Sequence, residues 1–314
     1  MGTPCYCFLC FLKKYLDKNK EGKDELMKTK LEKRVVFERS HTFLCAYKNL
    51  HNLPHWHGEH ELVLVRSGRV SLTVNGTVFV LTDGMCAFLH SEEIHCIQSE
   101  PLATVTVVKV DAAYFDRIIG TKRLQSPILT GTYELSKVFA ELFAEQKNKG
   151  EYSGIIADGI ATVLLARIFA REPLRADAAS HGKSDMRYKQ LLDLIATEYP
   201  YITFEEAVAY MNFSKPYFSK YFYRYAGMTF TQYLNTIKVG AAVEKLLQGK
   251  MTMTDVSQSC GFNTIRHFNR VFKELTGYAP NQLPPDYVFL RNLKEYADTG
   301  FDPTLSISEI LDME

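Results

Sequence analysis

The stretch "TMTDVSQSCGFNTIRHFNRVFKELTG" (252–277) decides the fold of the back half of this chain, because an earlier stretch repeats its pattern: "TFEEAVAYMNFSKPYFSKYFYRYAG" (203–227). Apolar residues match between the two copies, with one residue added in the turn. Each copy predicts a short amphipathic helix, a turn, and a second helix that ends at a glycine, Gly227 or Gly277. This is the layout of a helix-turn-helix unit.

The segment between the copies, "FTQYLNTIKVGAAVEKLLQG" (230–249), predicts one longer helix that holds the two units at a fixed separation. Two recognition helices on one rigid helix can enter successive major grooves of double-stranded DNA, about 34 Å apart. Residues 187–283 carry more Lys and Arg than Asp and Glu, although the whole chain has a net charge of only +1. The pattern therefore predicts a DNA-binding domain whose basic residues are locally clustered.

The sequence "CGFNTIRHFNRVFKELTGYAP" (260–280) resembles the second helix-turn-helix of the AraC family of bacterial transcription regulators. The resemblance extends over residues 187–283. It implies a sequence-specific regulator that is not an enzyme, with a front domain that senses a small-molecule effector and changes the placement of the recognition helices or a contact with RNA polymerase. One departure is clear: the family closes this unit with Pro-x-x-Tyr-Arg, and this chain has Pro280-Asn281-Gln282-Leu283-Pro284.

The family pattern also implies which side chains face DNA. Base-facing positions would be Pro216, Ser219 and Lys220 in the first recognition helix, and Ile265, Arg266 and Arg270 in the second. Arginine can clamp guanine through O6 and N7, and isoleucine suits a thymine methyl group. The other outward-facing candidates, among them the phosphate contacts, are Ser214, Lys215, Asn263, Thr264, His267 and Lys273.

The front half alternates apolar and polar residues from Val35 to Val110, which predicts short strands in a small barrel. "VNGT" (74–77) predicts a type I′ hairpin turn, and "TDGM" around Gly84 predicts another turn. The stretch "HWHGEHELVLVRSG" (55–68) resembles the first cupin motif, and Gly84 with His95 resembles part of the second, in which His90 and Glu92 replace the usual proline and glycine. The fold class is therefore α+β with two domains: a cupin-like β-barrel with covering helices, and an all-α double helix-turn-helix.

His55, His57 and Glu61, with His95 on a later strand, predict an effector pocket that is also a candidate metal site. Alternate residues of a strand point to the same side, and imidazoles with a carboxylate suit Zn, Mn, Fe or Ni. Two alternatives stay open: the same groups line an effector pocket without metal, or they satisfy one another. A further alternative function is a metal-dependent cupin enzyme, an oxygenase or isomerase, with an attached DNA-binding domain. The neighbouring Glu59 and His60 are expected to face solvent.

Residues 132–170 change to helical periodicity, with a break near "NKGEYSG" (148–154), and predict two helices that cover the barrel or form the seam of a homodimer. The expected organisation follows in chain order: an N-terminal extension (1–30), the barrel (31–115), the helical cover (116–170), a linker (171–186), the DNA-binding domain (187–283) and an acidic tail (284–314). The tail could dock on the basic domain or on a partner, but the favoured expectation is that it hangs free. The seven cysteines of the full chain fit no disulfide framework, so free thiols and a cytoplasmic location are expected. The N-terminal stretch, with its Cys5-x-Cys7-x-x-Cys10 motif, reads as neither a signal peptide nor a membrane span.

Overall fold

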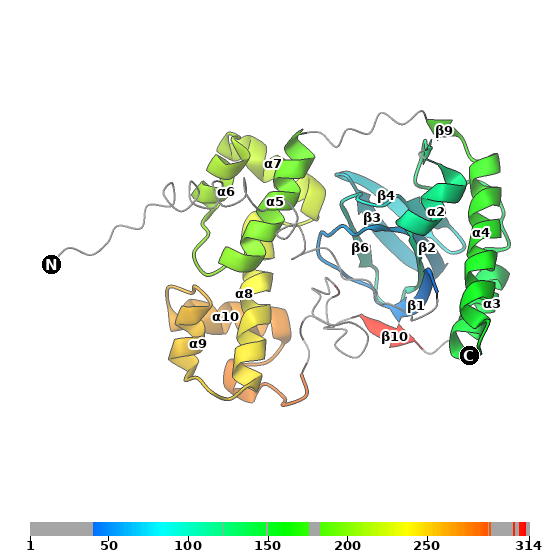
Figure 1. The fold of residues 1–314 in the computed structure, drawn as a ribbon. Coiled ribbons are helices and arrows are strands. Elements are labelled where there is room, and N and C mark those ends of the chain that lie inside the picture. The colour runs from blue at the N-terminus through cyan, green and yellow to red at the C-terminus, as the bar shows by residue number, and fades with distance from the viewer. Residues whose placement is uncertain are drawn as a thin grey trace.

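The computed structural model describes residues 40–120, 122–148, 150–175, 183–287, 289, 304 and 308–311. The expected N-terminal extension, with its cysteine motif, lies outside the described residues. Figure 1 shows a β-rich front domain (40–175) at the right and an all-helical back domain (183–289) at the left. The expected α+β class is confirmed, with a β-barrel under helices in front and helix-turn-helix units behind.

The strands of the front domain form two antiparallel sheets that face each other. One sheet has the order β10-β1-β7-β2-β5, and the other has the order β4-β3-β6. The strands are β1 (Thr42–Lys48), β2 (Glu59–Ser67), β3 (Arg69–Val74), β4 (Thr77–Thr82), β5 (Cys86–Leu89), β6 (His95–Ser99), β7 (Thr104–Asp111) and β10 (Glu309–Leu311). Asn75 and Gly76 both have positive φ angles, 46° and 75°, as the predicted hairpin turn between β3 and β4 requires.

Three helices cover the outer face of the larger sheet: α2 (Ala112–Ile119), α3 (Leu135–Asn148) and α4 (Ser153–Arg171). Outward-facing Leu62, Leu64 and Phe88 pack with Phe139 and Leu165 in one core, while a second core fills the space between the two sheets. The buried Asp158 of α4 holds the start of β1, because it accepts hydrogen bonds from Ser40, His41 and Thr42 at 2.8–2.9 Å. The two helices predicted over 132–170 are confirmed as the cover of the barrel.

The back domain is two helix-turn-helix units joined by one long helix. Its helices are α5 (Lys183–Glu198), α6 (Phe204–Met211), α7 (Lys215–Ala226), α8 (Phe230–Leu247), α9 (Met253–Ser259) and α10 (Ile265–Thr276). Side chains of Ser214 and Thr264 cap the recognition helices α7 and α10, and left-handed Gly227 and Gly277 end them. The predicted repeat and its linking helix are therefore present.

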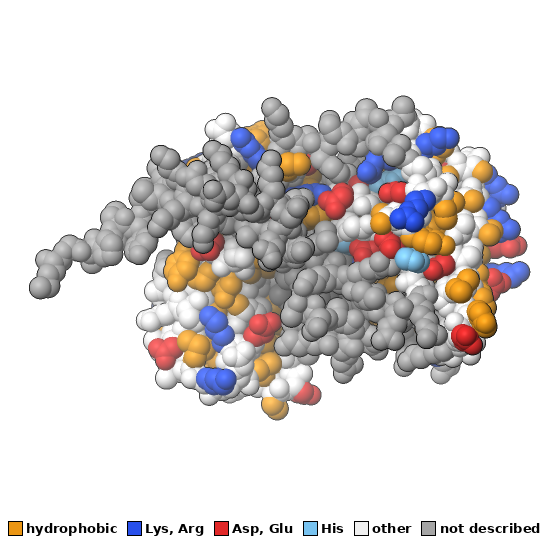
Figure 2. Space-filling model, viewed as in Figure 1, with side chains coloured by type: hydrophobic (Ala, Val, Ile, Leu, Met, Phe, Trp, Pro, Cys, Tyr) orange, Lys and Arg blue, Asp and Glu red, His pale blue; other side chains and the backbone are white. Residues whose placement is uncertain are grey.

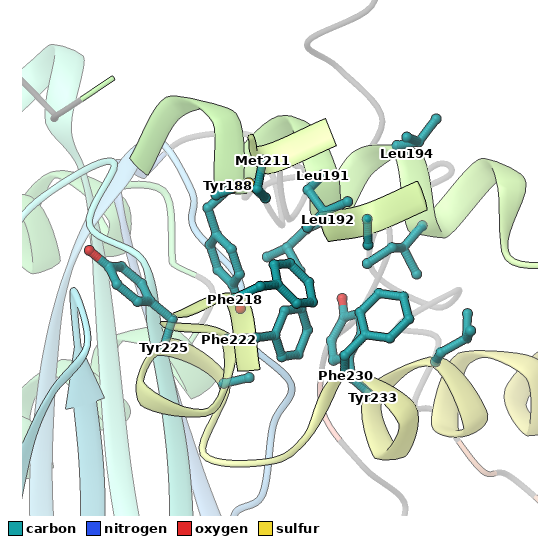
Figure 3. Packing of buried hydrophobic residues seen from close by; sticks show 14 of the residues in the cluster. Tyr188, Leu191, Leu192, Leu194, Met211, Phe218, Phe222, Tyr225, Phe230 and Tyr233 are labelled. Atoms are coloured by element: carbon teal, nitrogen blue, oxygen red, sulfur yellow. The ribbon is translucent and has the colours of Figure 1, made fainter. Parts of the chain in front are cut away.

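Each unit has its own aromatic core. Phe218 and Phe222 of α7 pack with Tyr188 of α5 and with Phe230 and Tyr233 of α8, as Figure 3 shows. The matching residues of the second unit, Phe268 and Phe272, pack against the other end of α8. Lys238 of α8 donates a hydrogen bond from Nζ to the carbonyl of Gly261 at 2.8 Å. This bond fixes the turn of the second unit on the linking helix.

The expected linker is shorter than residues 171–186. Leu174–Arg175 form β9, which pairs with β8 (Arg123–Leu124), and α5 already begins at Lys183. Glu172 is buried, and its carboxylate accepts hydrogen bonds from the backbone of Thr130 and Gly131 and from the Tyr133 hydroxyl. Composition alone does not reveal these contacts, since the segment is rich in small and charged residues.

The expectation of a freely hanging tail is wrong for its described end. β10 pairs with β1 through Ala46↔Leu311, Tyr47↔Ile310 and Lys48↔Glu309. Ser308 is fully buried, and its hydroxyl accepts a hydrogen bond from the His51 backbone at 2.9 Å. A three-residue strand at the open edge of a sheet gives too short a pattern to be recognised in an acidic segment.

The second unit closes differently from the family pattern. A 3₁₀ turn, Pro280–Gln282, comes directly after α10, where the family pattern closes the unit. Phe289 is buried in the core of this unit, and the Tyr287 hydroxyl donates a hydrogen bond to the carbonyl of Thr276 at 3.3 Å. Leu283, which stands at the tyrosine position of the motif, and the aromatic Tyr287 and Phe289 further along the chain pack on this core.

Candidate functional site

The predicted DNA contacts lie on the outer faces of the two recognition helices. Every one of them is exposed, and Phe218 and Phe268 on the opposite faces are buried. The exposed residues are Ser214, Lys215, Pro216, Ser219, Lys220, Asn263, Thr264, Ile265, Arg266, His267, Arg270 and Lys273. The fold therefore leaves both faces accessible to a large partner.

Two of these basic residues already have acidic neighbours. Arg270 Nη1 lies 2.9 Å from both carboxylate oxygens of Glu274, one turn along α10. Lys215 Nζ lies 2.9 Å from Glu205 of α6. Both pairs are exposed to solvent, so each contributes little to stability and is easily exchanged for a contact to a phosphate or a base.

The ends of two strands bring His55, His57, His95 and Glu61 together, and we call this group the histidine cluster. His55 and His95 face each other in an antiparallel bridge, and the candidate ligand atoms of the three histidines all lie within 4.8 Å of one another. Glu61 Oε2 lies 2.9 Å from His57 Nε2 and 3.8 Å from His95 Nε2. All four residues are buried. His55 and His57 lie just before β2 rather than within a strand, and the bridge between His55 and His95 brings the group together.

The three imidazoles are oriented in the same way. Nδ1 of His55, His57 and His95 lies 2.8, 3.1 and 2.8 Å from the backbone carbonyls of Leu53, Glu59 and Glu93. A carbonyl can only accept, so each ring donates from Nδ1 and turns Nε2 toward the cluster. Histidines that bind metals are usually held by a second hydrogen bond of this kind.

A cation fits the atoms at the centre of the histidine cluster. With Nδ1 donating, a neutral His57 would place two acceptors, its Nε2 and Glu61 Oε2, only 2.9 Å apart. A proton or a metal ion between them removes this repulsion. His95 Nε2 is buried and makes no hydrogen bond within the described part of the chain. This donor set, imidazole nitrogens with one carboxylate, suits a divalent transition metal.

Burial and neighbouring charges set the protonation of the histidine cluster. Burial lowers the pKa of His55 well below its usual value and that of His95 to about 4, so both rings are neutral. Burial acts to raise the pKa of Glu61, but the Lys109 ammonium, 3.7 Å away, and the hydrogen bond from His57 outweigh it and hold that pKa below its usual range. Glu61 is therefore a carboxylate. Lys109, the cross-strand partner of Glu61, was missed in the sequence, where it stands alone in an apolar strand.

The expectation that Glu59 and His60 face solvent is wrong. His60 is only 3% exposed, its Nε2 lies 2.9 Å from Asp116 of α2, and its Nδ1 accepts a hydrogen bond from the Ser91 backbone. The Glu59 side chain is only 12% exposed. His60 points to the outer face of the sheet, as expected for its strand, but α2 covers that face at this point.

Residues that flank the histidine cluster bind the front domain to the back domain, a contact that sequence reasoning missed. Leu53, Trp56 and Ile94 belong to the aromatic core of the first helix-turn-helix unit. Figure 3 shows Tyr225 at the side of this core that faces the strands of the front domain. Trp56 lies between His55 and His57, and Ile94 directly precedes His95. The same two segments therefore hold the cluster and the first unit.

Polar contacts extend this domain interface. Arg224 of α7 donates from Nε to the carbonyl of Gly76 at 3.0 Å, and Lys189 of α5 lies 2.7 Å from Glu92 and over the Trp56 ring. A Cβ at Gly76 would lie 2.8 Å from Arg224 Nε, so glycine serves both the hairpin turn and the close approach of α7.

One described helix, α4, is long and apolar enough to cross a membrane by length and composition alone. It packs its buried face on α3 and the sheet, as a covering helix does. Its outer face carries Ile155, Ile156 and Val163, which are 68%, 45% and 50% exposed. At the right-hand edge of Figure 2, hydrophobic side chains lie among charged ones.

Comparisons with known proteins match both domains. Residues 207–284 match the model of a helix-turn-helix domain, and residues 43–165 match the model of an AraC-like ligand binding domain. The HTH-type transcriptional activator RhaS of Klebsiella pneumoniae (strain 342) is 22% identical over 239 residues, covering 73% of this chain and 86% of RhaS. RhaS of Escherichia coli (strain SE11) is 20% identical over 243 residues, with the same coverage of 73% and 86%.

Among solved structures, ToxT from Vibrio cholerae O395 is similar with a TM-score of 0.37 and 12% identity, covering 76% of this chain and 95% of ToxT. The fold, the two exposed recognition helices and the ligand-binding domain define a DNA-binding transcription regulator rather than an enzyme. Within that class, the chain belongs to the AraC family. The alternative of a metal-dependent cupin enzyme is accordingly set aside.

Proposed function

We propose that this regulator binds double-stranded DNA with α7 and α10 in successive major grooves, under the control of a ligand in the front domain. The observation that carries the proposal is the pair of exposed, partly basic recognition helices fixed on one linking helix. Helix-turn-helix units read bases from the N-terminal part of the second helix. Pro216, Ser219 and Lys220 lie there in α7, as do Ile265, Arg266 and Arg270 in α10.

The other exposed candidates would position the protein on the phosphate backbone. Ser214 and Thr264 cap their helices through backbone N–H groups, which places both hydroxyls at helix starts where phosphate oxygens bind well. The remaining candidates lie at the starts of α7 and α10 or further along the exposed side of α10: Lys215, Asn263, His267 and Lys273. Such contacts hold the register and carry no base preference.

Selection of binding sites from random DNA with the full chain tests this function. We expect two short boxes about one helical turn apart, and a steep fall of affinity with salt on the selected duplex. A Lys220→Ala, Arg266→Ala double variant is the matched control and should lose the enrichment. Absence of enrichment with the unmodified chain would refute the proposal.

We propose that the histidine cluster is the ligand site of the front domain and holds a divalent metal ion, alone or together with a small-molecule effector. His55, His57, His95 and Glu61 supply the donors, and the Nδ1 bonds keep their rings in place. When bound, the metal would act as a Lewis acid that attracts an anionic or hydroxylated effector. Trp56 and Ile94 would transmit a shift of the cluster to the first helix-turn-helix unit.

Metal analysis of the purified full chain tests this site. We expect about one Zn, Mn, Fe or Ni per chain, and loss of that metal in His57→Asn and His95→Asn variants. His41→Asn, which changes a histidine outside the cluster, is the control and should keep the metal. A chain that neither carries nor takes up any of these metals after dialysis would refute the metal, while the DNA selection above would still test the regulator.

We further propose that the protein is a homodimer in the cytoplasm, that its two copies meet along α4, and that it acts as an activator through contact with RNA polymerase. Gly159 lies between Ile155 and Val163 on the exposed side of α4, where an added Cβ would contact nothing within 4 Å. Such a face allows a second copy of the same helix to approach closely around a two-fold axis. The two RhaS proteins named above are transcriptional activators, which supports activation rather than repression.

A further inference from the structure

Arg224 distinguishes the first recognition helix from the second. The helices α7 and α10 both have 12 residues and both end at a left-handed glycine, so Arg224 stands at the position of Glu274. In α10, Glu274 forms an ion pair with Arg270, one turn before it. In α7, both positions are basic, because Lys220 stands in place of Arg270. The two units therefore carry opposite charges at the same place.

The two cations of α7 lie one turn apart on one side of the helix. Lys220 and Arg224 are both exposed, and α7 itself contains no acidic residue. Like charges four positions apart weaken a helix, and an anion that binds between them removes the repulsion. On a recognition helix, the anion that such a pair suits is a phosphate of the DNA backbone.

The front domain orients the side chain of Arg224. Its Nε donates to the carbonyl of Gly76 at 3.0 Å, and its guanidinium carbon lies 5.8 Å from the centre of the Tyr225 ring. Among the described residues, none accepts a hydrogen bond from its two terminal nitrogens. A guanidinium group has five N–H donors, so the contact with Gly76 leaves four of them to bind an oxygen anion by paired, charge-assisted hydrogen bonds.

We propose that Arg224 binds a phosphate of the DNA backbone through its terminal nitrogens while Gly76 holds its Nε. This inference rests on the proposed docking of α7 in a major groove. Recognition helices read bases from their N-terminal part, and Arg224 lies one turn beyond the base-facing Lys220, where the helix leaves the bases. At the matching place in α10, Glu274 repels a phosphate. The first unit is therefore anchored to the backbone at this position, and the second is not.

The contact makes the front domain part of the DNA interface. Because Gly76 and the Tyr225 ring already hold the guanidinium group, less side-chain freedom is lost when it binds phosphate. Asn75, the other residue of the β3–β4 turn, accepts a hydrogen bond through its side chain from the Ile94 backbone at 3.0 Å. Ile94 directly precedes His95 of the histidine cluster. A shift of the cluster would thus reach the phosphate contact and change DNA affinity without changing which bases are read.

DNA-binding measurements on the full chain test this role, with the selected duplex and its single-base variants over a salt series. We expect Arg224→Gln to weaken binding to every sequence about tenfold and to lower the salt slope by about one. Arg224→Lys keeps the charge but cannot form paired bonds, so it should keep the salt slope and lose less affinity. Arg69→Gln, at the opposite end of β3 from the turn, is the matched control and should change neither.

Gly76→Ala tests the part of the front domain in this contact. The added Cβ would lie 2.8 Å from Arg224 Nε, so the guanidinium group has to move away. We expect Gly76→Ala to weaken DNA binding in the unmodified chain. It should cause no further loss in the Arg224→Gln variant, because both changes remove the same contact.

The results that would overturn the inference are distinct. The phosphate contact is wrong if Arg224→Gln leaves affinity and salt slope unchanged, if it tightens binding, or if it relaxes the preference at one base pair. Equal losses from Gly76→Ala with and without Arg224 would overturn the role of the turn. A chain that selects no DNA would refute the proposed function and this inference together, whereas normal selection with a silent Arg224→Gln would refute this inference alone.

Discussion

Replacement of Arg266 by alanine is a sharp test of how the second recognition helix meets DNA. Arg266 is exposed in the first turn of α10, where helix-turn-helix proteins contact bases. A guanidinium that bonds both O6 and N7 of guanine discriminates by about 1–3 kcal/mol. We expect Arg266→Ala to weaken binding to the best site by about fivefold to a hundredfold and to relax the preference at one base pair.

Arg270 differs from Arg266 because, before DNA binds, its guanidinium already forms an ion pair with Glu274. Breaking this exposed pair within one helix costs about 0.3–0.5 kcal/mol, much less than a good base contact returns. Arg270→Ala should therefore resemble Arg266→Ala, with a slightly smaller effect. Glu274→Gln should tighten binding about twofold, because it releases Arg270 and removes a negative charge near DNA.

Fluorescence anisotropy with the selected duplex and its single-base variants, repeated over a salt series, measures these effects. Lys273→Ala, the loss of a phosphate contact, should weaken all sequences alike and lower the salt slope by about one. Arg117→Ala, an exposed change on α2 of the front domain, is the control. If Arg266→Ala binds its best site with unchanged affinity and unchanged base preference, the docking of α10 proposed above is wrong.

Three other changes test the domain interface, the dimer and the buried histidines. Trp56→Ala should lower the free energy of unfolding by about 3–5 kcal/mol and split one calorimetric transition into two, because Trp56 joins both domains. Phe139→Ala, within the front-domain core, should lower that free energy without splitting the transition. A single transition in both variants would contradict the shared core. Val163→Glu should convert the proposed dimer to a monomer in sedimentation, whereas Val80→Glu, at a similarly exposed valine of β4, should not; a dimer that survives both changes does not use α4. Burial lowers the pKa of His90 to about 2 in the folded protein, whereas the pKa in the unfolded chain is about 6.5. The contribution of neutral His90 to stability is therefore fully present above pH 6.5. It is lost as the pH falls below that value, by up to about 1.4 kcal/mol per pH unit. Urea unfolding between pH 7 and 5 should therefore show a shallower loss for His90→Gln, and equal slopes would show that His90 takes up no extra proton on unfolding.

Local patterns made much of this fold predictable. The paired phenylalanines, the capping hydroxyls and the terminal glycines of the two units act within a few residues of chain, so they can be read from the sequence. The Asn75-Gly76 turn and the grouping of His55 with His57 depend on equally short spacings.

Contacts between distant segments were not predictable in the same way. Large apolar residues such as Trp56 and Ile94 could pack equally well inside the barrel or in the core of the back domain. Their sequence does not distinguish the two places, and the structure shows them in the core of the back domain. β8, β9 and β10 are two or three residues long, below the length at which alternation can be seen. The pairing of Lys109 with Glu61 depends on the register of β2 and β7, which no local signal in either strand specifies.

The four residues Glu92 to His95 show why these distant contacts matter for control. Glu92 pairs with Lys189 of α5, and Glu93 lies near the guanidinium groups of Arg123 and Arg175. Ile94 packs in the core of the first helix-turn-helix unit, and His95 belongs to the histidine cluster. Glu92 is held with a positive φ of 67°, and its backbone N–H donates to the carbonyl of His57 at 2.9 Å, so the segment cannot shift at one residue without moving its neighbours. A ligand at the histidine cluster and DNA on α7 would thus act on one short segment. Reciprocity then requires that any ligand that changes DNA affinity by a given factor is itself bound more tightly or more weakly on DNA by the same factor.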